Sequence, residues 1–162
     1  AFELGERRPR EPGSEEYLDS EKYQIRRWNL EADASLRPLM THINRIRHEN
    51  PCLQSDGNLT FHEIENDQLI AYSKSTSDGS NTLLVIVNLD PHHKHTGWLH
   101  LPPEAMGMPA TRPFQVHDLL SETRYQWNGP RHYIELDPQA MPAHVFRLRR
   151  WVRSEQQFEY FL

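Results

Sequence analysis

The chain has 162 residues, of which 18 are basic and 23 acidic, giving a formal net charge of −5. Its hydrophobic fraction of 36% is low for a globular protein, but four Trp, six Tyr and six Phe supply the aromatic mass for a modest core. These features exclude full disorder and give no electrostatic case for nucleic-acid binding.

Membrane insertion and disulfide chemistry are excluded next. No run of about 18 apolar residues occurs, so the sequence predicts no membrane span, and it contains no signal-peptide pattern. A single cysteine, Cys52, rules out an internal disulfide and a cysteine-rich zinc site, and fits a cytoplasmic protein. Nothing near Cys52 would lower its pKa, so we expect a small buried residue rather than a nucleophile. The first residue is not Met, which suggests a segment of a longer protein.

The first 34 residues are predicted to be irregular. Residues 6–16 are charged and interrupted by Pro and Gly, which is typical of a surface loop. Structureless loops of this length are uncommon in compact domains and are often functional, although a frayed end is an equal alternative.

One amphipathic helix is predicted over residues 35–50. Ser35 can cap its first turn, and Pro51 ends it. The apolar side chains follow the i, i+3, i+4 spacing of one helix face. They are Leu36, Leu39, Met40, Ile43 and Ile46. This stripe must face either the domain's own sheet or a partner outside the chain.

From residue 59 onward the pattern predicts short strands. They lie near 59–64, 68–75, 82–89, 96–101, 113–119, 124–127, 131–136 and 143–150. The continuous β-branched run at 82–87 predicts a central strand that is covered on both faces, whereas 131–136 alternates. Eight short strands at this spacing indicate an antiparallel β-sandwich. Residues 154–162 are expected to form a short closing helix.

Two clusters of polar residues are candidates for chemistry. His92, His93 and His95 follow Asp90, but their spacing matches no established zinc motif, so a polar loop is the favoured interpretation and no metal is expected. Glycosidases need two carboxyl groups at a defined separation, and residues 15–21 hold four. Their spacing in the sequence does not tell how far apart they lie in space.

The pair Lys22 and Tyr23 offers a different chemistry. A lysine ammonium can bind a phosphate as a point charge, and a tyrosine can present its ring to a sugar. A solvated lysine beside a packing tyrosine is the open alternative. A similar choice, between stacking on sugars and packing the core, applies to four aromatics in the strand region. These are Trp98, Tyr125, Trp127 and Tyr133.

Several of these segments resemble a known family. The combination of residues 13–23 (Gly-Ser-Glu-Glu-Tyr-Leu-Asp-Ser-Glu-Lys-Tyr) with 87–93 (Val-Asn-Leu-Asp-Pro-His-His) is specific. It is similar to the GlgE-type maltosyltransferases of the α-amylase superfamily, which extend α-1,4-glucan from maltose 1-phosphate. The similarity extends to about residue 150 through further short segments. They are 2–4, 43–51, 66–69, 116–120 and 142–144.

The resemblance implies a layout in which a mostly β fold follows the end of a (β/α)8 barrel. Residues 1–57 would be the barrel remnant, comprising the end of its last strand, a long loop and its last helix. Residues 58–150 would be the amylase-type antiparallel C-terminal β-sandwich, and 151–162 a tail. The absent barrel would cover the apolar stripe of the helix, and the loop would lie at the barrel mouth, where such folds build active sites.

The resemblance also limits the site. The family's nucleophilic Asp, acid/base Glu and further essential Asp come from earlier barrel strands, so no catalytic residue is expected in this chain and the fragment alone should be inactive. Lys22 and Tyr23 match the family's Lys-Tyr that contacts maltose 1-phosphate. The full-length parent would be a retaining transferase with an α-1,4-glucan acceptor and no cofactor. A homodimer through regions outside this chain stays open.

Two other readings remain at this point. One is a non-catalytic β-sandwich that binds glucan or serves as a scaffold, which the four aromatics would favour. The other is the C-terminal part of a related amylase-type hydrolase or trehalose synthase, against which the Lys22-Tyr23 pair argues because it indicates a phosphorylated donor.

Overall fold

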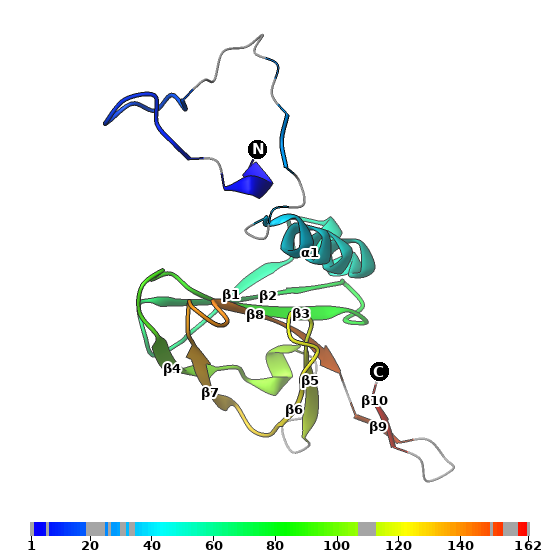
Figure 1. Cartoon of the computed structure of the whole chain (residues 1–162). Helices are drawn as coiled ribbons and strands as arrows, with labels where there is room; N and C mark the ends of the chain where they lie inside the picture. The colour runs from blue at the N-terminus through cyan, green and yellow to red at the C-terminus, as the bar shows by residue number, and fades with distance from the viewer. Residues whose placement is uncertain are drawn as a thin grey trace. The chain divides into compact units, whose positions relative to one another are not determined.

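The computed structural model describes residues 2–5, 7–18, 25, 27–29, 32, 35–106, 113–149, 151–153 and 159–161. The chain divides into two compact units, 1–45 and 46–162, and the boundary falls within helix α1. The second unit holds all of the strands in the described part of the chain (Figure 1). No described helix has the length and apolar character needed to cross a bilayer.

The chain begins with a short 3-10 helix, η1 (Phe2–Leu4), where the resemblance predicts the end of a barrel strand. The structure differs here because a strand needs neighbouring strands for its backbone groups. No described residue pairs with this segment in a ladder. The Glu3 carbonyl instead accepts a hydrogen bond from the Leu36 amide at 2.5 Å.

Residues 7–18 form an irregular surface loop, as predicted. The loop turns back on itself, because the Arg10 amide donates to the Glu16 carbonyl at 2.8 Å and the Leu18 amide to the Arg8 carbonyl at 2.7 Å. An exposed ion pair also joins the side chains of Arg10 and Glu16, with 3.0 Å between Arg10 Nη1 and Glu16 Oε2. Such exposed pairs contribute little to stability, so the loop rests mainly on its backbone hydrogen bonds.

The predicted helix is confirmed as α1 (Arg37–Glu49). The Ser35 hydroxyl accepts from the Arg37 amide at 3.3 Å, which satisfies one of the free amides of the first turn. Ile46 is buried, whereas Leu39 and Ile43 stay about half exposed, at 50% and 48%. The helix ends at Glu49, and Pro51 begins a 3-10 turn, η2 (Pro51–Gln54).

Two antiparallel sheets form a sandwich. The larger has six strands in the order β1-β2-β3-β8-β5-β6 and the smaller pairs β4 with β7. The bounds are β1 (Leu59–His62), β2 (Leu69–Ser75), β3 (Thr82–Asn88), β4 (His95–His100), β5 (Phe114–Asp118), β6 (Arg124–Trp127), β7 (Arg131–Leu136) and β8 (Ala143–Arg149). A 3-10 turn, η3 (Pro103–Met106), follows β4. All eight predicted strands are confirmed, with bounds that shift by at most two residues.

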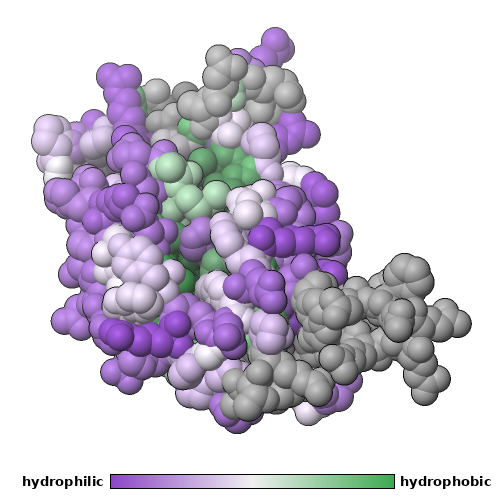
Figure 2. Space-filling view, turned by 90° about the horizontal axis from the view of Figure 1, so that it is seen from below, coloured by the Kyte–Doolittle hydropathy of each residue, from purple (hydrophilic) through white to green (hydrophobic). Residues whose placement is uncertain are grey.

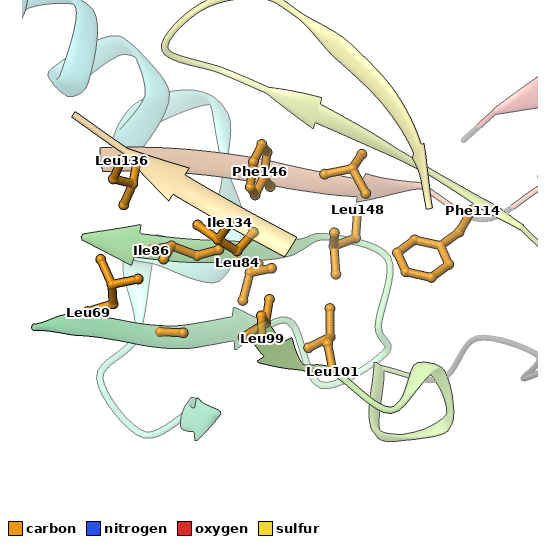
Figure 3. Close-up of a cluster of buried hydrophobic side chains, with 12 residues drawn as sticks. Leu69, Leu84, Ile86, Leu99, Leu101, Phe114, Ile134, Leu136, Phe146 and Leu148 are labelled. Carbon is orange, nitrogen blue, oxygen red and sulfur yellow. The ribbon is translucent and has the colours of Figure 1, made fainter. Parts of the chain in front are cut away.

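The main core lies between the two sheets, where apolar side chains from both point toward one another (Figure 3). Ile134 and Leu136 on β7 meet Leu84 and Ile86 on β3 in this cluster. A second, smaller cluster on the other face of the large sheet contains Leu83 and the buried residues of the α1–η2 segment. Strand β3 is thus covered on both faces and β7 buries alternate residues, both as predicted.

The closing helix expected at 154–162 is wrong in its described part. Residues Glu159–Phe161 form β10, which pairs antiparallel with β9 (Trp151–Arg153). Tyr and Phe favour extended conformations, and a neighbouring strand satisfies their backbone groups, which outweighs the weak helical pattern. Residues 154–158 lie outside the described part of the chain.

Candidate functional site

The predicted donor contacts Lys22 and Tyr23 lie outside the described residues, so their role stays a prediction. Two described residues beyond them expose large apolar side chains, Ile25 at 93% and Trp28 at 38%. Exposed apolar side chains close together in the sequence often mark a surface that another element covers. The side chains of Ile25 and Trp28 are therefore better candidates for a contact surface than for the core of an independent domain.

The carboxylates of the first loop do not converge in the described residues. Glu15 and Glu16 are exposed, and Glu16 is paired with Arg10. Asp19 and Glu21 lie outside the described residues. The described part of the loop therefore gives no support to a pair of glycosidase carboxyls.

The histidine segment is a loop that Asp90 organises. Asp90 Oδ1 accepts from the backbone amides of His92 at 2.8 Å and His93 at 3.3 Å, while Oδ2 accepts from His93 Nδ1 at 2.8 Å and His95 Nε2 at 3.1 Å. The hydrogen bond from the His92 amide, followed by those from His95 and His93, holds the pKa of Asp90 well below its usual range. Among the described side chains no group of three potential ligands is arranged to hold a metal ion. His92 and His93 thus lie in a polar loop between β3 and β4, and His95 is the first residue of β4.

Asn88 joins that loop to the smaller sheet through hydrogen bonds. Its Nδ2 donates to the carbonyls of His93 at 2.9 Å and Leu136 at 3.2 Å, and its Oδ1 accepts from the Asp90 amide at 2.9 Å. Asn88 is 7% exposed, so these hydrogen bonds form away from solvent, where an unpaired amide would be costly. The Asn-Leu-Asp segment thus has a structural role.

A buried carboxylate, that of Asp118, joins β5 to β8. It is fully buried, and its Oδ2 accepts from His144 Nδ1 at 2.9 Å and Ser121 Oγ at 2.7 Å. Burial raises the pKa of Asp118, but the hydrogen bonds from His144, Ser121 and the Leu120 amide outweigh it, so the net pKa is lowered. Ser121 donates to the aspartate rather than to the histidine, so the three residues lack the geometry of a nucleophilic triad. They fix the turn that follows β5.

A third buried group joins the end of α1 to the large sheet. Asn50 is 0% exposed, and its Oδ1 accepts from Arg147 Nε at 3.1 Å, Arg147 Nη2 at 2.9 Å and Asn81 Nδ2 at 3.1 Å. The Asn81 Oδ1 in turn accepts from the Cys52 amide at 3.1 Å. Cys52 is 1% exposed, which confirms the expected burial, and this burial raises the pKa of its thiol.

The four aromatics singled out in the sequence divide between core and surface. Trp127 packs against the main core and stacks on His132, with ring centroids 4.1 Å apart. Tyr125 on β6 is 41% exposed, while Trp98 and Tyr133 are 40% and 55% exposed and form an edge-to-face pair across β4 and β7. The prediction of core packing is thus confirmed for Trp127, whereas the other three aromatic side chains are exposed at the surface.

Comparisons with known proteins agree with these arrangements. The family model described as "GLGE, C-terminal" matches residues 61–148. The chain is 46% identical over 154 residues to the alpha-1,4-glucan:maltose-1-phosphate maltosyltransferase of Chlorobaculum tepidum, a match covering 91% of this chain and 23% of the relative. It is 38% identical over 160 residues to the protein of the same name from Myxococcus xanthus, covering 99% of this chain and 24% of that one. The chain therefore spans about a quarter of the length of these curated relatives.

Solved structures share the fold at lower identity. A variant of AmyP in complex with maltotriose superposes with a TM-score of 0.56 at 19% identity, over 74% of this chain and 22% of that one. The alpha-amylase from Geobacillus thermoleovorans in complex with acarbose gives a TM-score of 0.55 at 19% identity, over 80% of this chain and 25% of the amylase. These matches confirm the predicted amylase-type fold.

Proposed function

The chain belongs to the GlgE family, and on that premise we propose that it is the C-terminal region of an enzyme that transfers maltosyl units from maltose 1-phosphate to the non-reducing end of α-1,4-glucans. The observation that carries the proposal is the 46% identity across 154 residues with a relative named for this reaction. Because the relatives are about four times as long, the activity belongs to the longer protein rather than to this chain.

In this proposal residues 1–57 are the end of the catalytic (β/α)8 barrel, 58–150 the β-sandwich that follows it, and 151–162 a tail. The exposure of one row of apolar side chains supports the assignment, with Leu36, just before α1, at 39%, and Leu39 and Ile43 on α1 at 50% and 48%. An amphipathic helix is stable when its apolar face is covered, and the last helix of a barrel is covered by its neighbours in the ring.

The proposed reaction is a double displacement with retention. A carboxylate from an earlier barrel strand attacks C1 of the maltosyl group, the C1–O bond to phosphate breaks, and inorganic phosphate leaves with the electron pair. The 4-hydroxyl of the acceptor glucan then attacks C1 of the β-maltosyl enzyme, gives up its proton to a general base, and releases the carboxylate.

Lys22 and Tyr23 are the residues of this chain that we assign to the donor. The ammonium of Lys22 would neutralise the phosphate while the donor binds and while charge accumulates on the leaving group. The Tyr23 phenol would bind a sugar hydroxyl or pack against the ring face of the maltosyl group.

The experiment is an assay of phosphate release from maltose 1-phosphate, with and without glycogen, on the longer protein and on this chain alone. We expect acceptor-dependent release and elongation by the longer protein and none by the chain. Hydrolysis of glucan without use of maltose 1-phosphate would assign the protein to the amylase-type hydrolases instead. Phosphate release by the chain alone would contradict the assignment of the catalytic carboxylates to the barrel.

A further inference from the structure

We propose that the outer face of the β4–β7 sheet is a binding platform for an α-glucan chain, formed by Trp98 and Tyr133 and flanked by Arg131, Glu65 and His100. The choice of α-glucan as the ligand rests on the proposed function, whereas the platform itself rests on the geometry of these five side chains.

The two aromatic rings form the centre of the platform. Trp98 and Tyr133 are cross-strand partners, and their ring centroids lie 5.4 Å apart at an interplanar angle of 66°. Both rings are substantially exposed. Aromatic side chains of this size are readily buried when another element packs against them. Two rings inclined to each other form an open corner, into which the apolar C–H face of a pyranose can pack.

The platform is rigid because core residues directly follow its two aromatic members along β4 and β7. Leu99 is 0% and Ile134 3% exposed, and both belong to the main core. Gly97 lets the strand approach its neighbour closely, since a Cβ at this position would lie 3.2 Å from the Asn66 Cβ. A sugar binding here would therefore meet rings held on fixed backbone, with little ordering cost on the protein side.

Polar groups lie on both sides of the rings. Segment 63–65 runs along β4, with the Glu65 amide donating to the Trp98 carbonyl at 3.0 Å and the His100 amide to the Glu63 carbonyl at 2.9 Å. The Glu65 carboxylate then accepts from Arg131 Nη2 at 2.8 and 2.9 Å and from His100 Nε2 at 2.7 Å. The Arg131 guanidinium also lies over the Trp98 ring, 4.5 Å from its centroid, and so fixes the indole.

The charges select a neutral ligand. The hydrogen bonds from His100 and then Arg131 lower the pKa of Glu65, so the carboxylate is ionised at neutral pH and compensates Arg131. On the far side, Lys94 Nζ pairs with Glu135 Oε1 at 2.7 Å. Each charge thus has a counter-charge, which disfavours an ionic ligand, while their remaining lone pairs and N–H groups suit the hydroxyls of a sugar.

The surroundings do not resemble a dry protein interface. Viewed from below, from the side on which β4 and β7 lie, the surface is largely hydrophilic with residues of intermediate hydropathy among them (Figure 2). Hydrophobic residues gather in a central strip of this face rather than covering it. A pair of aromatics in a charge-balanced, largely hydrophilic surface fits a polyhydroxylated chain better than an apolar protein partner.

Sequence reasoning identified the two rings but not their polar partners. Glu65 lies 66 residues before Arg131 and meets it only because segment 63–65 aligns with β4, whose neighbour is β7. The sequence signal that could have found Arg131 was the alternation of residues 131–136, which places Arg131 on the same outward face as Tyr133 and Glu135.

The test is electrophoresis of the 162-residue chain in native gels with and without glycogen. We expect glycogen to retard the wild-type chain, and Trp98→Ala and Tyr133→Ala each to weaken the apparent affinity by about tenfold or more, since about 1.4 kcal/mol of lost ring contact corresponds to tenfold. The matched control is Tyr125→Ala, an exposed aromatic on β6, which should change the affinity by less than about twofold. Titration of tryptophan fluorescence with maltoheptaose, and with cellohexaose for comparison, tests the preference for α-linked chains.

A wild-type chain that glycogen does not retard would overturn the platform, as would equal losses in Tyr125→Ala and Trp98→Ala. Tyr133→Ala removes the more exposed ring, so it keeps the test informative even if Trp98→Ala fails to fold. The gel contains no maltose 1-phosphate, and phosphate release by the longer protein does not require the platform. Failure of the platform and failure of the proposed function are therefore distinguishable.

Discussion

The two units of the chain use their apolar residues in opposite ways. In the sandwich, Leu84, Leu99 and Leu136 are each 0% exposed, whereas in the first unit Leu39 is 50% and Ile43 48% exposed. The polar residues show the same contrast, with Asp118 buried among four donors and Glu16 exposed beside Arg10. A domain that encloses its own core is self-sufficient, so we propose that the first unit is the part of this chain that needs a partner.

The largest difference in stability between the units is expected when one leucine in each is truncated to alanine. Leu84→Ala opens a cavity between the sheets and should lower the free energy of unfolding by about 3–4 kcal/mol. Leu39→Ala removes a half-exposed side chain and should cost less than about 0.5 kcal/mol. Urea denaturation followed by tryptophan fluorescence measures both. Similar losses in the two variants would show that the α1 stripe is covered within this chain.

The buried carboxylate gives the next largest effect. Asp118→Ala leaves His144 and Ser121 without their shared acceptor and should destabilise the sandwich by about 3 kcal/mol. Glu16→Ala, which breaks only the exposed pair with Arg10, is the matched control and should cost about 0.5 kcal/mol or less. Equal effects, measured by the same denaturation, would refute the structural role given to Asp118.

Asn50 tests the attachment of the helix to the sheet. Asn50→Ala removes the acceptor shared by Arg147 and Asn81 and should cost about 2 kcal/mol, because buried donors lose their partner. The control is Gln54→Ala, which removes one exposed hydrogen bond to the Arg47 carbonyl and should cost about 0.5 kcal/mol. Thermal melts of the two variants that coincide with each other would contradict this account.

The smallest effect is a dependence on pH in the sandwich. Burial lowers the pKa of His132, partly opposed by a backbone hydrogen bond with Gly129. The unfolded chain therefore takes up a proton near pH 6.5 that the folded chain does not, so stability falls as pH drops below that value toward the lowered folded pKa. His132→Phe keeps a ring against Trp127 and cannot titrate, so its unfolding free energy should fall less between pH 7.5 and 5.5, by a difference below about 1 kcal/mol. His62, whose pKa burial also lowers, titrates in both proteins, and identical slopes would refute the assignment.

Prediction from the sequence succeeded where local patterns decide the structure. Periodicity gave α1 and the eight strands of the sandwich, because alternation and helical spacing are properties of neighbouring residues. It could not give contacts across long separations, such as Arg147 with Asn50, 97 residues apart. The 3-10 turn at Phe2–Leu4 and strand β10 differ from expectation because short segments take the conformation that their partners allow.

The candidate site shows the same division. The resemblance drew attention to Asp90, Asp118 and His144 through the segments that contain them, and their roles as buried or loop-organising acceptors and donors emerged only from the structure. Trp98 and Tyr133 were recognised as aromatics that could stack on sugars, but their choice between surface and core depended on the register of β4 with β7. Lys22 and Tyr23 remain predictions from the family resemblance.

We propose that the first unit supplies donor contacts to a catalytic barrel and that the sandwich supports this barrel. The most direct measurement is kcat/KM for maltose 1-phosphate in the longer protein carrying Lys22→Ala, with Lys74→Ala on β2 as the matched control. The account predicts a loss equivalent to about 1–3 kcal/mol of transition-state stabilisation for Lys22→Ala, with activity close to wild type for Lys74→Ala. Wild-type kinetics in the Lys22→Ala protein would contradict it.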